Sequence, residues 1–219
     1  MSKDLLLKRI ARDIAGCRAC RKGCTGLPVP GEGDPDARVV FIGEAPGREE
    51  ARTGRPFVGR SGRLLREMIA GIGLREDEVF ITSPGHYQPL RGTPTAEMVR
   101  HGREHLFRQL AVIDPRVIVL LGATACRAVL DRKVEVAKLH GSAVRTENRT
   151  CFITLHPAYA LRFPKAKEEM QADFRKLGRL VSSLGVRRPG RRREDHSTQK
   201  SCRIQYDLRC NSIRVHKGS

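Results

Sequence analysis

A glycine- and proline-rich stretch, Gly43–Gly47, follows the apolar run 39–42 and carries one carboxylate, Glu44. The apolar run predicts a buried strand, so this stretch is a turn at the end of that strand. Glycines let backbone amides approach a ligand closely, and a carboxylate there can orient a water molecule. Phe57, next to Pro56, offers a ring face on which a flat ligand can stack. The competing interpretation is an ordinary strand-to-helix connection with a core Phe.

His156 is a second polar side chain at the end of an expected strand, because it follows the apolar run 152–155 and precedes Pro157. A neutral imidazole in this position can donate a hydrogen bond to a developing oxyanion. A loop His is more often a polar surface residue, but ligands of parallel sheets bind beyond the carboxyl ends of the strands. His156 is therefore a catalytic candidate.

Three cysteines, Cys17, Cys20 and Cys24, lie in a loop rich in Gly and Pro near the N-terminus. The two-residue spacing between Cys17 and Cys20 can present two thiolates to one metal ion or cluster. A pair of free thiols is the alternative. The chain has seven cysteines in all, an odd number, and its charged N-terminus does not resemble a signal peptide. We therefore do not expect a disulfide framework.

Strand-like and helix-like patterns alternate along the chain. The expected strands are 39–42, 79–82, 117–121 and 152–155. The expected helices are 5–14, a segment capped by Ser61 and stopped by Gly73, one capped by Thr95 that runs to Val112, a short one opened by Gly122, and 165–182. This order predicts a three-layer α/β/α fold around a central four-stranded parallel sheet. The loops 43–59, 83–94 and 156–162 leave strand ends and mark the expected site.

The chain has 219 residues and a net charge of +18. Such an excess favours a polyanionic partner, nucleic acid first. Residues 184–219 contribute +7 and show no helix or strand period, so we predict a domain at 1–183 and a disordered basic tail at 184–219. The tail is either a non-specific DNA arm or a dispensable extension.

The longest apolar run, 117–121, is far shorter than the roughly 20 residues that span a membrane. We expect no membrane association and a cytoplasmic location.

Four motifs in combination resemble a family 4 uracil-DNA glycosylase: CxxC at 17–20, GEAPG at 43–47, TGRPFVG at 53–59 and HPAYALR at 156–162. The resemblance covers about residues 14–182. It implies a uracil-DNA glycosylase fold and a monomeric base-excision-repair enzyme that acts on uracil-containing DNA. Such an enzyme flips the base out and hydrolyses its N-glycosidic bond, which leaves an abasic site.

The resemblance also implies individual roles. Glu44 would position or activate the attacking water, and His156 would donate to uracil O2. Phe57 would stack on the extruded base, and Glu50 would assist with the water or the sugar cation. The full expected base-contacting set is Gly43, Glu44, Ala45, Phe57, Ser83 and His156. The expected DNA contacts are Arg55, Arg60, Leu161 and Arg162.

Ser83 departs from the family pattern, which has Asn after the second strand to read the uracil edge. A hydroxyl both donates and accepts but is shorter, so base discrimination would be weaker or differently built. Two alternatives stay open on this ground. The first is a glycosylase for another deaminated base, hypoxanthine or xanthine. The second is a catalytically decayed DNA-binding or damage-sensing module.

The family usually carries a [4Fe–4S] cluster held by four cysteines, and the chain keeps only Cys17 and Cys20 of these. Tyr87 and Gly102 stand at the aligned positions of the other two. Cys24, His86 and His101 are the nearby candidates for replacement. Incomplete ligation would mean a weak cluster, a different metal or none. The cluster would be structural, and the chemistry would not need it.

A Rossmann-type nucleotide binder is disfavoured, because no G-x-G-x-x-G follows the first strand.

Overall fold

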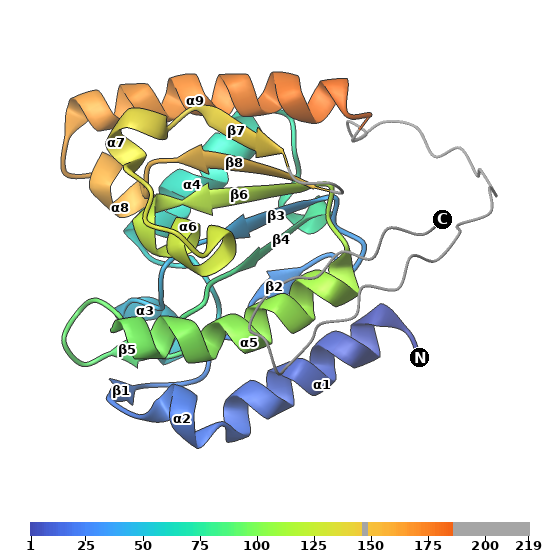
Figure 1. The fold of residues 1–219 in the computed structure, drawn as a ribbon, viewed down its shortest axis with the longest axis vertical. Coiled ribbons are helices and arrows are strands. Elements are labelled where there is room, and N and C mark those ends of the chain that lie inside the picture. Colours follow the sequence, from blue (N-terminus) through green and yellow to red (C-terminus); the bar gives the residue numbers. More distant parts are fainter. Residues whose placement is uncertain (146–148, 186–219) are drawn as a thin grey trace. The chain divides into compact units, whose positions relative to one another are not determined.

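In the computed structural model, residues 1–145 and 149–185 are described, and they build a six-stranded sheet with helices on both faces (Figure 1). The described residues all lie within one unit, Met1–Pro189. The predicted basic tail lies outside the described residues from position 186 onward.

The sheet has the order β2-β4-β3-β6-β8-β7. Its four central strands are parallel: β3 (Val39–Ile42), β4 (Val79–Thr82), β6 (Val117–Leu121) and β8 (Thr150–Thr154). The first three have the predicted bounds, and β8 overlaps the strand predicted at 152–155. Antiparallel strands flank them, β2 (Glu32–Gly33) beside β4 and β7 (Ser142–Arg145) beside β8. These edge strands were not predicted, because β2 has two residues and β7 has no apolar run.

Alternating side chains of the central strands feed two apolar cores. On one face, β3 contributes Val39 and Phe41 to a core closed by α4 (Arg60–Gly71) and α9 (Pro164–Ser183). On the other face, Val40 and Ile42 join a core closed by α5 (Ala96–Ile113) and α6 (Gly122–Leu130). All four β3 side chains are buried, as expected for a parallel strand between two helical layers. The three-layer α/β/α prediction is confirmed.

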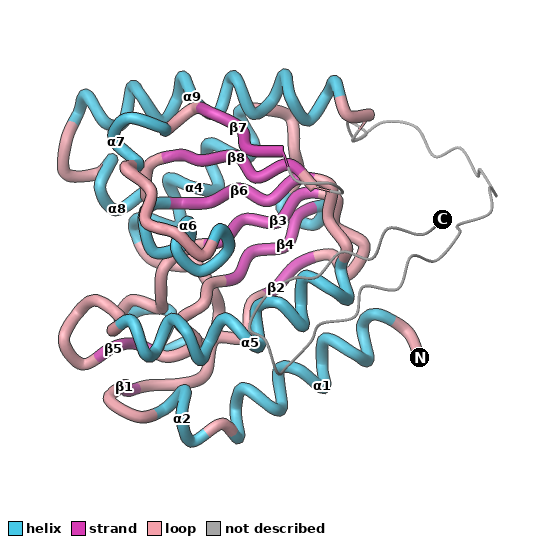
Figure 2. The backbone as a smooth tube through the Cα atoms, viewed as in Figure 1, coloured by secondary structure: helices cyan, strands magenta, loops and turns pink. Residues whose placement is uncertain are grey.

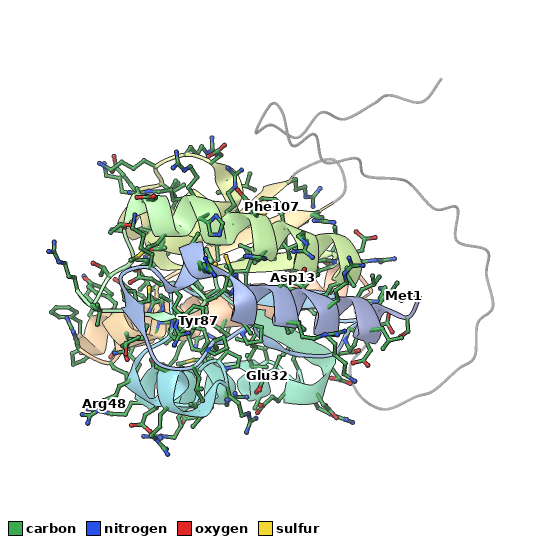
Figure 3. All side chains as sticks on the ribbon, turned by 90° about the horizontal axis from the view of Figure 1, so that it is seen from below. Met1, Asp13, Glu32, Arg48, Tyr87 and Phe107 are labelled. Carbon is green, nitrogen blue, oxygen red and sulfur yellow. The ribbon has the colours of Figure 1, made fainter. Side chains whose placement is uncertain are left out.

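Helix α1 (Lys3–Gly16) packs along the outer side of α5, and the short α2 (Arg18–Arg21) follows it (Figure 1). A two-stranded antiparallel sheet, β1 (Cys24–Thr25) with β5 (Gln88–Pro89), lies close to these helices (Figure 2). Tyr87, seen against the C-terminal part of α1 in Figure 3, donates its hydroxyl to the carbonyl of Ala15 at 3.1 Å.

Of the two N-caps predicted from the sequence, the one at Thr95 is confirmed and the one at Ser61 is wrong. Thr95 caps α5 as predicted, since its hydroxyl accepts the Met98 amide at 3.2 Å. Ser61 does not cap α4, because the helix already begins at Arg60 and Gly59 is its N-cap. The Gly59 carbonyl accepts the Arg63 amide, which fixes that earlier start.

Short elements complete the order: α3 (Arg48–Thr53), a 3-10 turn (Glu76–Glu78), α7 (Val136–Leu139) and α8 (Pro157–Ala160). Within the described ranges, every helix is too short or too polar to cross a membrane.

Candidate active site and metal-ligand group

The carboxyl ends of β3, β6 and β8 meet at one edge of the sheet, where α3, α6 and α8 also lie (Figure 1). The Gly43–Gly47 turn leaves β3 there, Gly122 opens α6 after β6, and His156 follows β8 as the N-cap of α8. Glu44 and His156 are far apart in the sequence, but the Glu44 carboxylate is close enough to the His156 ring to act on its pKa.

His156 is held as a neutral ring. Its Nδ1 accepts the Ala158 amide at 3.2 Å, which leaves the hydrogen of the neutral imidazole on Nε2. Burial lowers the pKa of His156, although the Glu44 carboxylate opposes that shift. Gly122 sits against this side chain with φ +86°, and a Cβ there would lie 3.0 Å from the His156 Cβ. The ring is thus a neutral N–H donor at the sheet edge.

Phe57 adopts a left-handed backbone with φ 52°, which is unusual for an aromatic residue and costs about 1–3 kcal/mol. Its surroundings enforce this conformation. A Cβ on Gly62 would lie 1.7 Å from the Phe57 carbonyl oxygen, so only glycine allows α4 to approach. The Phe57 ring lies over Gly43 and has its centroid 6.1 Å from that of His156, with the planes tilted by 35°.

Glu44 has a partner that the sequence did not reveal. Its Oε2 accepts the hydroxyl of Thr124, in the first turn of α6, at 2.6 Å. Its own carbonyl accepts the Gly85 amide at 3.1 Å. Ala45 lies so close to Gly85 that a Cβ on the glycine would be 2.6 Å from the Ala45 Cβ. The GEAPG turn is therefore hydrogen-bonded to α6 and to the loop that follows β4.

Glu50 is buried and both of its oxygens bind backbone amides. Oε1 accepts Gly59 at 2.8 Å, and Oε2 accepts Gly47 at 3.1 Å. The carboxylate thus closes the loop that carries Phe57 by tying its two ends together. These contacts give Glu50 a positioning role in the loop.

Ser83, which directly follows β4, is buried and donates its hydroxyl to the Gly85 carbonyl at 2.6 Å. Its proton is therefore engaged, and the oxygen keeps the capacity to accept. The family's Asn at this position would offer an amide donor as well.

The expected DNA contacts lie on exposed segments. Leu161 and Arg162 follow α8 and are exposed. Two aromatic neighbours, Tyr159 and Phe163, are about half exposed with ring centroids 4.8 Å apart. This aromatic pair was not predicted from the sequence, although its spacing of four residues near the end of a strand was a usable signal.

The two arginines of the Phe57 loop differ. Arg55 is paired with Glu32 through two contacts, Nε to Oε2 at 2.9 Å and Nη2 to Oε1 at 3.0 Å. Arg60 is exposed at the first position of α4. The charge of Arg60 thus faces solvent. The charge of Arg55 is balanced by its ion pair with Glu32.

Four side chains gather beside α1, α2 and α5: Cys17, Cys20, His101 and His105. One ligand atom of each lies within 4.8 Å of the others. Within the group, Cys17 Sγ lies 3.1 Å from His101 Nε2. Burial raises the pKa of Cys17, but hydrogen bonds from Cys20, His105 and His101 outweigh it and lower the pKa to about 6.

This metal-ligand group differs from the sequence expectation in its members. Cys17, Cys20 and His101 belong to it, whereas Cys24 and His86 do not. His105 was missed, and the H-x3-H spacing of two histidines one helical turn apart was the signal for it.

Comparisons with known proteins agree with this architecture. The family model described as the Uracil DNA glycosylase superfamily matches residues 30–178. A type-4 uracil-DNA glycosylase of Archaeoglobus fulgidus is 40% identical over 185 residues, which are 80% of this chain and 92% of that protein. The type-4 uracil-DNA glycosylase of Thermotoga maritima is 38% identical over 166 residues, 74% of this chain and 86% of that protein.

A type-5 uracil-DNA glycosylase of Pyrobaculum aerophilum is also similar, at 35% identity over 150 residues, which are 61% of this chain and 66% of that protein. The type-4 relatives thus match over more of the chain. The sheet order, the motifs at its carboxyl edge and this coverage lead to one conclusion: the chain belongs to the type-4 family of the uracil-DNA glycosylase superfamily.

Proposed function

We propose that this chain is a DNA-repair glycosylase that hydrolyses the N-glycosidic bond of uracil in DNA and leaves an abasic site. The observation that carries the proposal is the meeting of Glu44, His156 and Phe57 at the carboxyl edge of the sheet. Membership of the family and the type-4 relatives support the same activity.

A base stacked in a duplex is out of reach, so the uracil must be flipped into this site. The Phe57 ring provides a flat face for the extruded base. The ring already packs over Gly43 and its left-handed backbone packs against Gly62, so this face is ordered before the base binds, which lowers the entropic cost of binding.

Bond cleavage sends negative charge onto uracil O2 while the sugar becomes cationic. The Nε2–H of His156 would donate to O2, and the donor is fixed in advance because Nδ1 is held by the Ala158 amide. A preorganised donor of this kind is worth about 2.7–4 kcal/mol in the barrier.

Glu44 would hold the attacking water and balance the developing positive charge on the sugar. Its Oε2 already accepts the Thr124 hydroxyl, and Oε1 would accept from the water. Thr124 acts as a positioning residue in this proposal, as does Glu50 through the Phe57 loop.

Exposed residues after α8 would engage the duplex. Leu161, with Tyr159 and Phe163 beside it, would fill the space that the flipped base leaves. Arg60 and Arg162 would contact phosphates, and Arg55 would do so only by giving up Glu32. Binding would weaken as salt concentration rises.

In this proposal the domain 1–183 acts as a monomer on uracil-containing DNA, and the basic segment 184–219 adds non-specific affinity. The activity would place the chain with the nucleoid in the cytoplasm of a prokaryote.

An excision assay tests the proposal. Labelled oligonucleotides that hold uracil, hypoxanthine, xanthine or only normal bases are incubated with the protein, and alkali then reveals abasic sites. Uracil release is the expected result. DNA binding without release of any base would instead favour a decayed module.

A second function, removal of hypoxanthine or xanthine, is favoured by Ser83. Because its hydroxyl proton binds the Gly85 carbonyl, Ser83 can only accept from a bound base. An acceptor fits the N3–H of uracil, but it fits the N1–H of hypoxanthine and xanthine as well. Release of those bases in the same assay would move the chain to this sister activity.

A further inference from the structure

We propose that Cys17, Cys20, His101 and His105 bind a single zinc ion in tetrahedral geometry, in place of the iron–sulfur cluster implied by the family. The ligands come from two places. Cys17 is the N-cap of α2 and Cys20 lies within it, whereas His101 and His105 lie one turn apart on α5. The spacings C-x2-C and H-x3-H are those of structural Cys2His2 zinc sites.

The size of the group fits one ion. Zinc binds sulfur at about 2.3 Å and nitrogen at about 2.0–2.1 Å, so two ligands of one tetrahedral ion lie roughly 3.3–3.8 Å apart. In the structure the four ligand atoms are all within 4.8 Å of one another, and Cys17 Sγ is already 3.1 Å from His101 Nε2. An ion would need only a small inward adjustment of the side chains.

The same compactness argues against a cluster. A [4Fe–4S] cluster takes one thiolate on each of four irons, and a Rieske-type [2Fe–2S] cluster takes its two cysteines and two histidines on different irons. Either arrangement spreads the ligands around a body of several atoms. Four atoms that lie this close together leave room for a point ion at their centre.

The two positions aligned with the family's other cysteines have become unsuitable for ligation. A Cβ on Gly102 would lie 1.7 Å from the Pro84 carbonyl oxygen, so α5 and the loop 83–94 are packed too tightly for a cysteine there. Tyr87 uses its hydroxyl on the Ala15 carbonyl at the end of α1. Gly102 and Tyr87 therefore both have structural contacts at these positions and supply no metal ligand.

The chemistry of the ligand set is consistent with a half-buried zinc ion. Two thiolates and two neutral imidazoles give a neutral complex with Zn²⁺, which avoids the cost of burying net charge. Cys17, Cys20 and His101 are partly exposed and His105 is buried, so an ion can enter from solvent. The His101 and His105 rings stand edge to face at 5.8 Å and 86°, so both are oriented before an ion arrives.

The ion would be structural, because it joins α2 to α5. From there a series of close contacts leads to the site: Gly102 of α5 packs on Pro84, and Gly85 packs on Ala45 of the GEAPG turn. The zinc site would thus stabilise the backbone of the GEAPG turn, which carries Glu44. This inference concerns metal binding and stands whether or not uracil is the substrate.

Metal analysis of the full-length protein tests the proposal. The protein is purified from cells supplied with both iron and zinc, and zinc, iron and acid-labile sulfide are measured per chain. We expect one zinc ion, neither iron nor sulfide, and a colourless preparation. A brown preparation with iron and sulfide, or a preparation without bound metal, would overturn the proposal.

Matched variants assign the ligands. Cys20→Ser and His105→Asn should each lower zinc content at least tenfold, whereas Cys24→Ser, which removes a nearby cysteine outside the group, should retain it. Zinc that persists in both ligand variants, or that disappears in Cys24→Ser, would contradict the assignment.

X-ray absorption at the zinc edge keeps the test decisive if a ligand variant fails to fold. The unaltered protein should show two sulfur ligands at about 2.3 Å and two nitrogen ligands at about 2.0 Å. Four sulfur ligands, or oxygen and nitrogen ligands alone, would exclude the proposed set.

Discussion

The ring of Phe57 occupies the space directly over Gly43, so that a Cβ built on the glycine would lie 2.5 Å from the ring's Cζ. The GEAPG turn and the stacking ring are thus one packed unit, although 14 positions separate these two residues. A glycine at the start of the turn is required by the ring rather than by its own backbone angles.

Gly43→Ala should therefore displace Phe57 and lower uracil excision about 100-fold, since a shift of about 1 Å in an active site has an effect of that size. Single-turnover excision and thermal unfolding measure the two possible effects separately. Gly71→Ala is the control, because a Cβ there meets nothing within 4 Å. Wild-type excision by Gly43→Ala would show that the ring position does not matter for the reaction.

His156→Ala should slow the chemical step by a factor of about 10² to 10³, because it removes a preorganised donor to the leaving base. Affinity for uracil-containing DNA should stay near that of the unaltered protein. Rapid-quench kinetics and a binding titration measure the two quantities. Unchanged excision would remove His156 from the mechanism.

The pH dependence of excision should reflect the partly buried imidazole of His156. Burial lowers the pKa of His156, so the ring should stay neutral at pH 6.5 and become protonated only at lower pH. Protonation at Nδ1 would place two donors face to face at the Ala158 amide and turn the ring away. The acid limb of the rate profile should have its midpoint below pH 6.5.

An NMR titration of the His156 ring checks this assignment directly. The same shift makes folding less favourable as the pH falls from 6.5 through the lowered pKa, because the unfolded chain then binds the proton more readily. A ring that titrates at or above pH 6.5 would contradict the prediction.

Glu50→Gln should destabilise the fold by about 1–3 kcal/mol, because a side-chain amide cannot accept both the Gly47 and Gly59 amides as the carboxylate does. Excision should fall as well, because the loop that carries Phe57 loses the hydrogen bonds that join its two ends. Chemical denaturation gives the free energy of unfolding.

Glu49→Gln is the matched control for that experiment. Glu49 is an exposed neighbour whose ion pair with Arg52 lies on the surface, so its loss should cost roughly 0–1 kcal/mol. If the two variants are equally stable, the two hydrogen bonds of Glu50 do not stabilise the loop and the prediction is wrong.

Leu161→Ala should reduce excision from duplex DNA more than from single-stranded DNA, because only a duplex has a stack to refill after the base is flipped. A difference of several-fold between the two substrates is expected. Leu5→Ala, at another exposed leucine in α1, should affect neither substrate. Equal loss on both substrates would place Leu161 outside the duplex-opening step.

The sequence by itself determined the alternation of elements and the edge of the sheet at which the site lies. Continuous apolar runs such as 117–121 are buried on both faces, and this local property predicted the four parallel strands. Because parallel strands end at one edge, the motifs after 39–42 and 152–155 had to lie together. Strands without an apolar run, β2 and β7, carried no such signal.

The tertiary structure decided what each polar side chain is available to do. Hydrogen bonds to residues two to nine positions away occupy both Glu50 oxygens and the Ser83 proton, and only the folded backbone shows that these groups are engaged. Glu44 and Thr124 are joined across 80 positions, and no local pattern encodes that partner. The metal-ligand group depends on the same kind of information. The packing of α1 and α2 on α5 brings two cysteines to two histidines about 80 positions away, and a ligand set is defined by distances in space.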